Sequence, residues 1–232
     1  NITNCKSAAE VLQVTGNNWK ANQSDLFDQF GNKITTHKAI LREDTGKCLG
    51  VVGRGYQSMN LEESFNIFDS LIQSERVTLD SLKVFEDGKK VVYSTKLESF
   101  EIKQNDILIP RLNIVQSFDG SNSYRIFFTT FRIVCQNVLV SSSAKSIMSI
   151  KHTRTMPERV QFAEVALQKA FEYFEEMKKV SFEMVKTRIN DSYVEMILNE
   201  LVGDSKKEDG KDKTRTVNIK NTIYGLFKNG KG

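Results

Sequence analysis

Residues 123–140, SYRIFFTTFRIVCQNVLV, limit the possible folds more than any other segment of the chain. Side chains alternate across a strand, and here both alternate sets are apolar. One set is Ile126, Phe128 and Val134, and the other is Phe127, Phe131 and Ile133. A strand that is apolar on both sides is a central strand covered on both faces. The sequence therefore predicts a sheet with further structure packed against it.

Turn signals on either side of this segment predict antiparallel pairing. Residues 77–85 and 89–97 flank Asp87-Gly88, a strong hairpin signal. A second predicted hairpin pairs residues 107–117 with 124–135 across FDGSN, and Pro110 places the start of its first strand at an edge or a bulge. Earlier in the chain, DQFGNKI predicts a hairpin around Gly31-Asn32, and EDTG at 43–46 predicts another turn.

Helix signals lie before and after the predicted sheet. Capping boxes at Ser7–Glu10 and Asn60–Glu63 predict helices, the second with its apolar residues at helical spacing between 61 and 72. A third, at 155–158, opens a long helix at about 156–188, and a shorter helix spans 191–202. We therefore predict an α+β fold in which a twisted antiparallel sheet packs against a long C-terminal helix and shorter helices.

The same signals predict how the chain is divided. We expect one domain at 1–202, with its sheet core at about 33–140. A charged linker follows at 203–215, and a basic helix at 216–232. We also expect this chain to be an inner portion of a longer protein.

The glycine-rich stretch GVVGRGYQ, residues 50–57, raises the question of a phosphate loop. Its GxxGxG spacing fits neither the dinucleotide fingerprint nor the GxxxxGK[ST] loop, and Asn60 already caps the following helix. The alternative is that the glycines form a structural bend, which presents Arg54 and Tyr56 to a polynucleotide.

Composition narrows the range of functions. The net charge is +4, but basic residues gather before the long helix and after residue 213, a distribution that suits phosphate groups or ordinary solvation. With two histidines far apart, three scattered cysteines and no nucleophile motif, the sequence predicts no enzyme, no metal site and no cofactor. No apolar run approaches the roughly 18 residues of a membrane span, and no signal peptide is evident.

Three motifs together resemble a known family. LGVVGRGYQSMNLEESF, SFDGSNSYRIFFTTFRIVCQN and IKHTRT follow in the order and spacing of the phage/plasmid-like protein family, which carries a domain-of-unknown-function label. The resemblance implies a phage or mobile-element origin and a bacterial cytoplasm, with no established activity. Phe118 departs from the pattern, because many members are expected to have histidine there. If that histidine is chemically active in them, this chain lacks the activity.

The predicted layout also resembles, at the level of fold, phage single-strand annealing proteins of the RecT/Erf/Sak kind. Annealing needs a cationic groove that holds a backbone and leaves the bases readable, often repeated along an oligomer. We therefore predict single-stranded DNA binding and annealing by a homo-oligomer. The alternative is a protein-interaction module, such as an anti-defence or replication-accessory factor that binds an acidic partner. The predicted nucleic-acid-binding residues are Arg54, Tyr56, Arg125, Arg132, Lys145, Lys151, His152 and Arg154.

Overall fold

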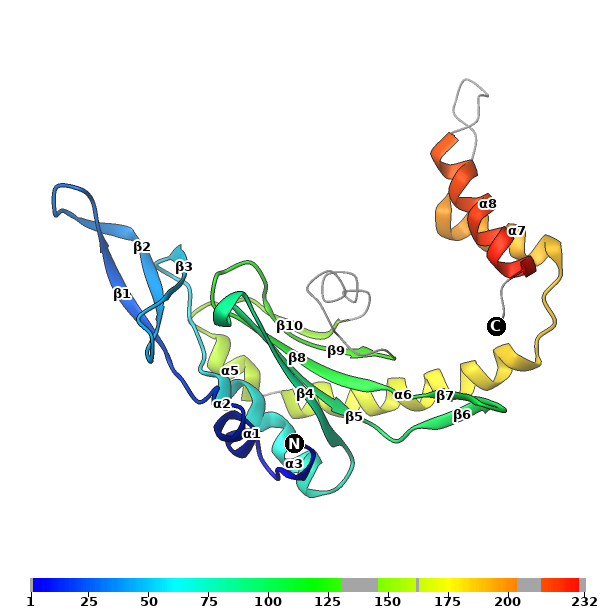
Figure 1. The fold of residues 1–232 in the computed structure, drawn as a ribbon, viewed down its shortest axis with the longest axis horizontal. Coiled ribbons are helices and arrows are strands. Elements are labelled where there is room, and N and C mark those ends of the chain that lie inside the picture. The colour runs from blue at the N-terminus through cyan, green and yellow to red at the C-terminus, as the bar shows by residue number, and fades with distance from the viewer. Residues whose placement is uncertain (1, 131–145, 162, 204–213, 230–232) are drawn as a thin grey trace. The chain divides into compact units, whose positions relative to one another are not determined.

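The computed structural model describes residues 2–130, 146–161, 163–203 and 214–229 (Figure 1). They form two compact units, Asn1–Ser181 and Phe182–Gly232. The first unit holds antiparallel sheets and several helices, so the predicted α+β class is confirmed. The second half of the strand predicted at 124–135 lies outside the described residues.

Short helices open the chain, with η1 at Ile2–Asn4 and α1 at Ala8–Val14. The Ser7 hydroxyl accepts a hydrogen bond from the Glu10 N–H at 3.3 Å, as the predicted capping box requires. The Glu10 carboxylate, however, accepts from the N–H of Lys6 and not from that of Ser7. The helix start is therefore confirmed, while the reciprocal bond is shifted by one residue.

A three-stranded antiparallel sheet follows, with strand order β1-β2-β3. The predicted turns DQFGNKI and EDTG are confirmed, since they connect its strands. Gly50 and Gly53 belong to the third strand, so the predicted glycine bend is wrong for these two residues, and only Gly55 lies beyond the strand. The strands are β1 Ala21–Phe27, β2 Lys33–Arg42 and β3 Cys48–Gly53.

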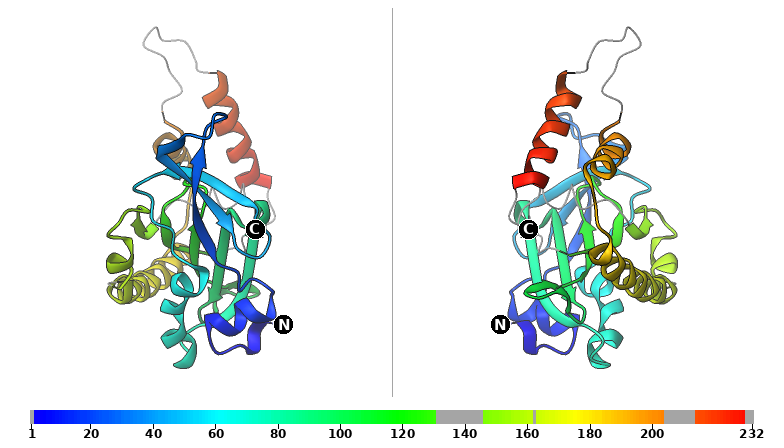
Figure 2. Two further views of the ribbon diagram at one scale, coloured as in Figure 1. Left: turned by 90° about the vertical axis from the view of Figure 1, so that its left-hand side faces the viewer. Right: turned by 90° about the vertical axis from the view of Figure 1, so that its right-hand side faces the viewer.

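The helical region after Asn60 has the predicted capping box, in which the Asn60 N–H donates to the Glu63 carboxylate at 3.3 Å. The helix is broken, however, into α2 (Leu61–Phe65), η2 (Asn66–Phe68) and α3 (Asp69–Gln73). Two further views show α1 (blue) beside these helices (cyan) at one end of the first unit (Figure 2).

The main sheet has five antiparallel strands in the order β10-β9-β8-β5-β4. The hairpin around Asp87-Gly88 is confirmed: η3 (Glu86–Gly88) joins β4 to β5, with Asp87 at φ 58° and Gly88 at φ 112°. The β8–β9 hairpin is also confirmed. The strands are β4 Thr78–Phe85, β5 Lys90–Lys96, β8 Arg111–Ser117, β9 Tyr124–Thr129 and β10 Ser146–Ile150.

A separate two-stranded hairpin, β6 (Phe100–Lys103) with β7 (Asp106–Leu108), connects β5 to β8. Residues 107 and 108, predicted to start the strand opposite β9, instead pair with β6. Pro110 directly precedes β8, a central strand with no bulge in its pairing with β5 or β9, so the predicted edge or bulge at this point is wrong. The proline is tolerated because it stands just before the first residue of the strand.

Both faces of the five-stranded sheet are buried. On one face, the rings of Phe65 and Phe68 stack on Tyr93 at centroid distances of 4.8 and 5.9 Å. On the same face, the Tyr124 hydroxyl donates to the Ser64 carbonyl at 2.8 Å. The opposite face holds an apolar cluster of Val92, Val115 and Phe127, with Phe85 packed against it. The strand predicted to be covered on both sides is thus confirmed over Tyr124–Thr129.

Helices complete both units. In the first unit, the rings of Phe174 and Tyr173 on α6 lie 5.9 Å from those of Phe100 and Phe128 respectively. The helix predicted at about 156–188 is described as two helices, α5 and α6, and α6 continues into the second unit. The bounds are α5 Met156–Gln161, α6 Ala163–Lys186, α7 Asp191–Val202 and α8 Thr214–Asn229.

Candidate nucleic-acid interface

The three motifs on which the family resemblance rests meet at one end of the five-stranded sheet. β3 approaches the β8–β9 turn so closely that a Cβ atom on Gly50 would lie 2.5 Å from the Asp119 Cα. In the turn itself, Gly120 has φ 76° and lies against Val52 and Tyr56. Glycine is required at these two positions by a close approach and by a left-handed backbone conformation.

The third motif is joined to the first by a reciprocal contact. The rings of Tyr56 and His152 stack at 4.6 Å with an interplanar angle of 22°. The Gln57 N–H donates to the His152 carbonyl at 3.0 Å, and His152 Nδ1 lies 3.1 Å from the Gln57 carbonyl oxygen. The Tyr56 hydroxyl donates to the Ser117 carbonyl at 2.6 Å. We call these four residues, Tyr56, Gln57, Ser117 and His152, the lock.

Burial fixes the protonation state of the two rings in the lock. Because Nδ1 of His152 faces a carbonyl, it carries the proton, and Nε2 is a buried acceptor without a partner in the described part of the chain. Burial lowers the pKa of His152, although the Gln57 carbonyl and the Asp119 carboxylate act in the opposite direction. Burial and the Asp119 charge raise the pKa of Tyr56. Both rings are therefore neutral at pH 7.

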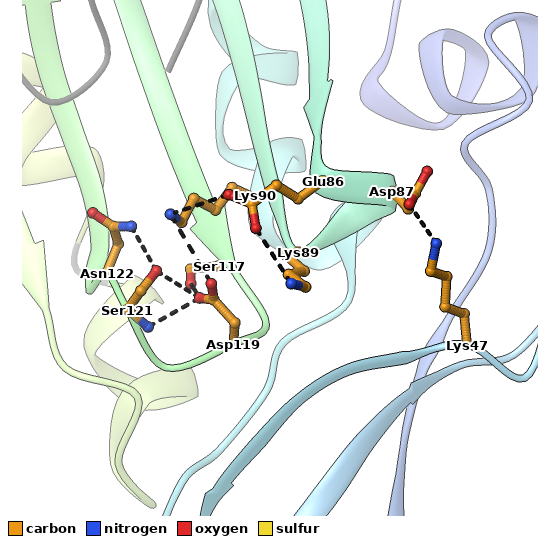
Figure 3. A network of polar contacts seen from close by, with 9 residues as sticks. All are labelled: Lys47, Glu86, Asp87, Lys89, Lys90, Ser117, Asp119, Ser121 and Asn122. Atoms are coloured by element: carbon orange, nitrogen blue, oxygen red, sulfur yellow. Dashed lines mark hydrogen bonds and ion pairs between the residues drawn. The ribbon is translucent and has the colours of Figure 1, made fainter. Parts of the chain in front are cut away.

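The β8–β9 turn beside the lock is held by Asp119 (Figure 3). Its Oδ1 accepts from the Ser117 hydroxyl at 2.6 Å and from the Ser121 N–H at 2.9 Å, and Lys90 Nζ lies 4.0 Å from Oδ2. Burial alone would raise the pKa of Asp119, but these hydrogen bonds and the Lys90 charge bring it below its ordinary value. Asp119 therefore serves local hydrogen bonding within the turn.

Three of the predicted binding residues are exposed cations next to the lock in the chain. Arg54 lies two residues before Tyr56, and Lys151 and Arg154 flank His152. None of the three makes an ion pair within the described residues. The Arg54 guanidinium donates to the Thr35 carbonyl at 3.3 Å, and its backbone N–H donates to the Thr36 carbonyl at 3.0 Å. The lock therefore ties together two segments, about a hundred residues apart in sequence, that carry these three free positive charges.

Tyr56 and His152 were also predicted to bind nucleic acid, but unlike the three cations they are not exposed. Tyr56 is half-buried and His152 is buried, and their rings contact each other. Their observed contacts join the two segments that carry the neighbouring cations, and the stacked face of each ring is already occupied.

Arg125 lies on β9, the strand between β8 and β10. It pairs with Ser149 on β10, two residues before Lys151, and it shares a face with Val115. Its Nε is buried without a partner among the described residues, and its guanidinium lies 5.6 Å from the Phe127 ring. Burial lowers the pKa of Arg125. The remaining two predicted residues, Arg132 and Lys145, lie outside the described residues.

We call the lock, together with β3 and the β8–β9 turn that it adjoins, the junction. The sequence did not single out Gln57, Lys90 or Ser117 as part of it. Gln57 acts through its backbone N–H and carbonyl, and Ser117 accepts the Tyr56 bond through its backbone carbonyl. No residue pattern can reveal such main-chain contacts. Lys90 is buried, with Nζ 4.0 Å from both Glu86 and Asp119, and the Asp87-Gly88 hairpin signal beside it gave no hint of this.

Phe118, where the family resemblance suggested histidine, is fully buried, and its ring lies 5.4 Å from that of Trp19. Its role here is packing. Arg42 lies 4.6 Å above the same Trp19 ring and donates to the Asp87 carbonyl at 3.0 Å. Trp19 thus helps join the three-stranded sheet to the turns of the five-stranded sheet.

Across the described ranges, no group of three or more His, Cys, Asp or Glu side chains is placed to hold a metal ion. The same residues include no helix that is both long and apolar enough to cross a membrane.

The chain is thus an α+β protein in which the β8–β9 turn meets the segments that follow β3 and β10. These two segments carry exposed cations. The chain belongs to the family of the domain of unknown function DUF932, whose model matches residues 48–231. The match begins at the first residue of β3, so β1 and β2 precede it. No curated protein and no solved structure shows significant similarity to the chain.

Proposed function

We propose that this protein binds single-stranded nucleic acid through a phosphate-binding site formed by Arg54, Lys151 and Arg154. One observation supports the proposal above others: the lock holds together two segments whose exposed cations have no carboxylate partner among the described residues. Phosphate groups are the chemical partners that unpaired lysine and arginine clusters bind, and a polynucleotide offers them in a row.

Annealing of complementary strands is the activity we infer for this site, in phage or plasmid recombination in the bacterial cytoplasm. It requires backbone contacts and readable bases, and it requires no nucleophile. Since the Tyr56 and His152 rings stack on each other, base stacking by these two residues is not part of the proposal. Arg125 is a candidate for a further backbone contact, because it lies opposite the residues that lead into Lys151.

A test of the proposal measures binding of a labelled single strand and of the matching duplex by fluorescence anisotropy across a salt series. We expect tighter binding to single strands of any sequence, and a logarithmic salt slope of about −0.7 for each phosphate neutralised. The triple variant Arg54→Glu, Lys151→Glu, Arg154→Glu should reduce the steepness of this slope by about 2. Annealing is then scored by the pairing of two complementary labelled strands.

The control is Lys103→Glu, an exposed lysine on β6. β6 follows the Lys96 end of β5, whereas the junction adjoins its Lys90 end, so this charge change is remote from the site. A wild-type protein that fails to bind single strands, or a triple variant that binds as the control does, would contradict the proposal.

A second function, binding of an acidic protein partner, is favoured by one observation. α8 carries Arg215, Lys220 and Lys228 and no acidic residue, beside the exposed apolar side chains of Leu226 and Phe227. Pull-down of one defined partner, with no binding to single strands, would select this function instead.

A further inference from the structure

The two helices α7 and α8 of the second unit bury few of their apolar side chains. Between α7 and α8, only Val194 and Leu198 of α7 are buried, and α8 has no buried residue. Polar contacts hold the two helices together: Lys228 lies 2.6 Å from Asp191, and Lys220 donates to the Asn199 side chain at 2.5 Å. A helix pair of this kind has little apolar burial to stabilise it.

Each helix carries a stripe of exposed apolar side chains. The residues follow the three-to-four spacing of one helix face, a pattern that normally faces a core. The most exposed are Leu201 at 76% and Leu226 at 66%. The exposed apolar residues are Tyr193, Met196, Ile197 and Leu201 on α7, and Ile219, Ile223, Leu226 and Phe227 on α8.

The charges of the two helices are opposite. α7 contains Asp191, Glu195 and Glu200 and no basic residue. α8 contains three basic residues and no acidic one. A polynucleotide or an acidic protein that reached α8 would meet the carboxylates of α7 beside it, whereas a second α7–α8 pair offers each helix its complement. In a twofold arrangement, the surface of one copy matches the same surface of the other.

We propose that α7 and α8 form a dimerisation unit, in which the pairs from two copies of this chain associate into a four-helix bundle. α7 of one copy lies against α8 of its partner, and the exposed stripes of both copies form the bundle core. The cations of the proposed phosphate site belong to the first unit, so dimerisation can fail while nucleic-acid binding persists, and the reverse.

Sedimentation equilibrium of the full chain without nucleic acid tests the stripe. We expect wild-type dimers, and for Leu201→Glu, Leu226→Glu a dimer dissociation constant at least about a hundredfold higher, because a carboxylate in an apolar contact is strongly unfavourable. The control Ile107→Glu changes an exposed apolar residue of β7 in the first unit and should leave the dimer intact. A monomeric wild-type chain, or a double variant as dimeric as the control, would overturn the proposal.

A charge exchange tests the pairing of α7 with α8 even if single variants lose some helix content. One variant, Glu195→Lys, Glu200→Lys, has two basic helices, and the other, Arg215→Glu, Lys220→Glu, has two acidic helices. Each should be monomeric alone because like charges face each other, and mixing should give heterodimers. Circular dichroism checks helix content. If both variants still form homodimers, or if the mixture remains monomeric, the proposed pairing is wrong.

Discussion

The two larger sheets of the first unit are built from similar strands but are stabilised very differently. In the five-stranded sheet, every residue of β8 is buried, and so are six consecutive residues of β5. In the three-stranded sheet, β1 has no buried residue, and β2 buries only Ala39 and Ile40. The first is a core element with tertiary contacts on both faces, whereas the second is fixed mainly at its base, where Gly50 meets the Asp119 turn. The junction lies where the buried sheet meets the exposed one.

The largest expected difference between the two sheets is the loss of stability when one ion pair is removed from each. Asp80 in β4 is completely buried and lies 3.1 Å from Arg111 Nε and 2.9 Å from Lys96 Nζ. Asp80→Ala leaves the buried Arg111 without its carboxylate, and we expect a loss of about 3–5 kcal/mol in the free energy of unfolding. Asp25→Ala breaks the exposed pair with Lys33 in the three-stranded sheet and should cost less than about 1 kcal/mol.

Urea unfolding, followed by circular dichroism, gives the free energy of unfolding of both variants. Equal losses for the two aspartates would contradict the contrast between the buried and the exposed sheet.

The next largest effect is expected where the two sheets touch. Gly50→Ala puts a methyl group against the Asp119 backbone, and the shift needed should cost about 1–3 kcal/mol. Gly53→Ala, in the same strand, meets nothing within 4 Å and should be nearly neutral. The midpoints of urea unfolding compare the two variants. Similar midpoints would mean that β3 is not held against the turn.

The turns of both sheets and the ends of several helices could be predicted from the sequence, because their signals are local. Asp87-Gly88, the Asn60–Glu63 capping box and the helix at 191–202 depend on residues within a few positions of one another. The junction could not be predicted in this way. Tyr56 meets His152 through the tertiary fold, and Gly50 is needed because of Asp119, which is far away in sequence. The β6–β7 hairpin was missed because its strands are only four and three residues long.

A smaller effect is expected within the lock. Tyr56→Phe keeps the ring stack on His152 and removes the hydrogen bond to the Ser117 carbonyl, which should cost about 1 kcal/mol. Tyr93→Phe is the matched control, because the Tyr93 hydroxyl is buried without a hydrogen-bond partner in the described part of the chain. The free energy of unfolding should be reduced only by the first substitution. A Tyr56→Phe protein as stable as the Tyr93→Phe control would show that the Tyr56 hydroxyl does not tie the segment after β3 to β8.

The smallest effect is a pH dependence. The pKa of His152 is lowered in the folded state from its ordinary 6.5, so the unfolded chain binds this proton more readily. The contribution of the neutral His152 side chain to the free energy of unfolding is fully present above pH 6.5, and it is lost as the pH falls from there through the folded pKa. His152→Gln should flatten this part of the stability curve, while His37→Gln, at an exposed position of β2, should not.

Thermal unfolding between pH 5.5 and 8 gives the melting temperature of the wild type, His152→Gln and His37→Gln. A wild-type curve that rises as the pH falls below 6.5 would contradict the buried, neutral imidazole.

The central claim is that the Tyr56–His152 contact makes separate cations act as one phosphate site, and Tyr56→Leu tests it most directly. This variant keeps Arg54, Lys151 and Arg154 but loses the ring stack and the hydroxyl. In a single-strand binding titration at fixed low salt, we predict an affinity at least about tenfold below that of the wild type, since the cations no longer present a common surface. A folded Tyr56→Leu protein that binds single strands as tightly as the wild type would contradict the claim.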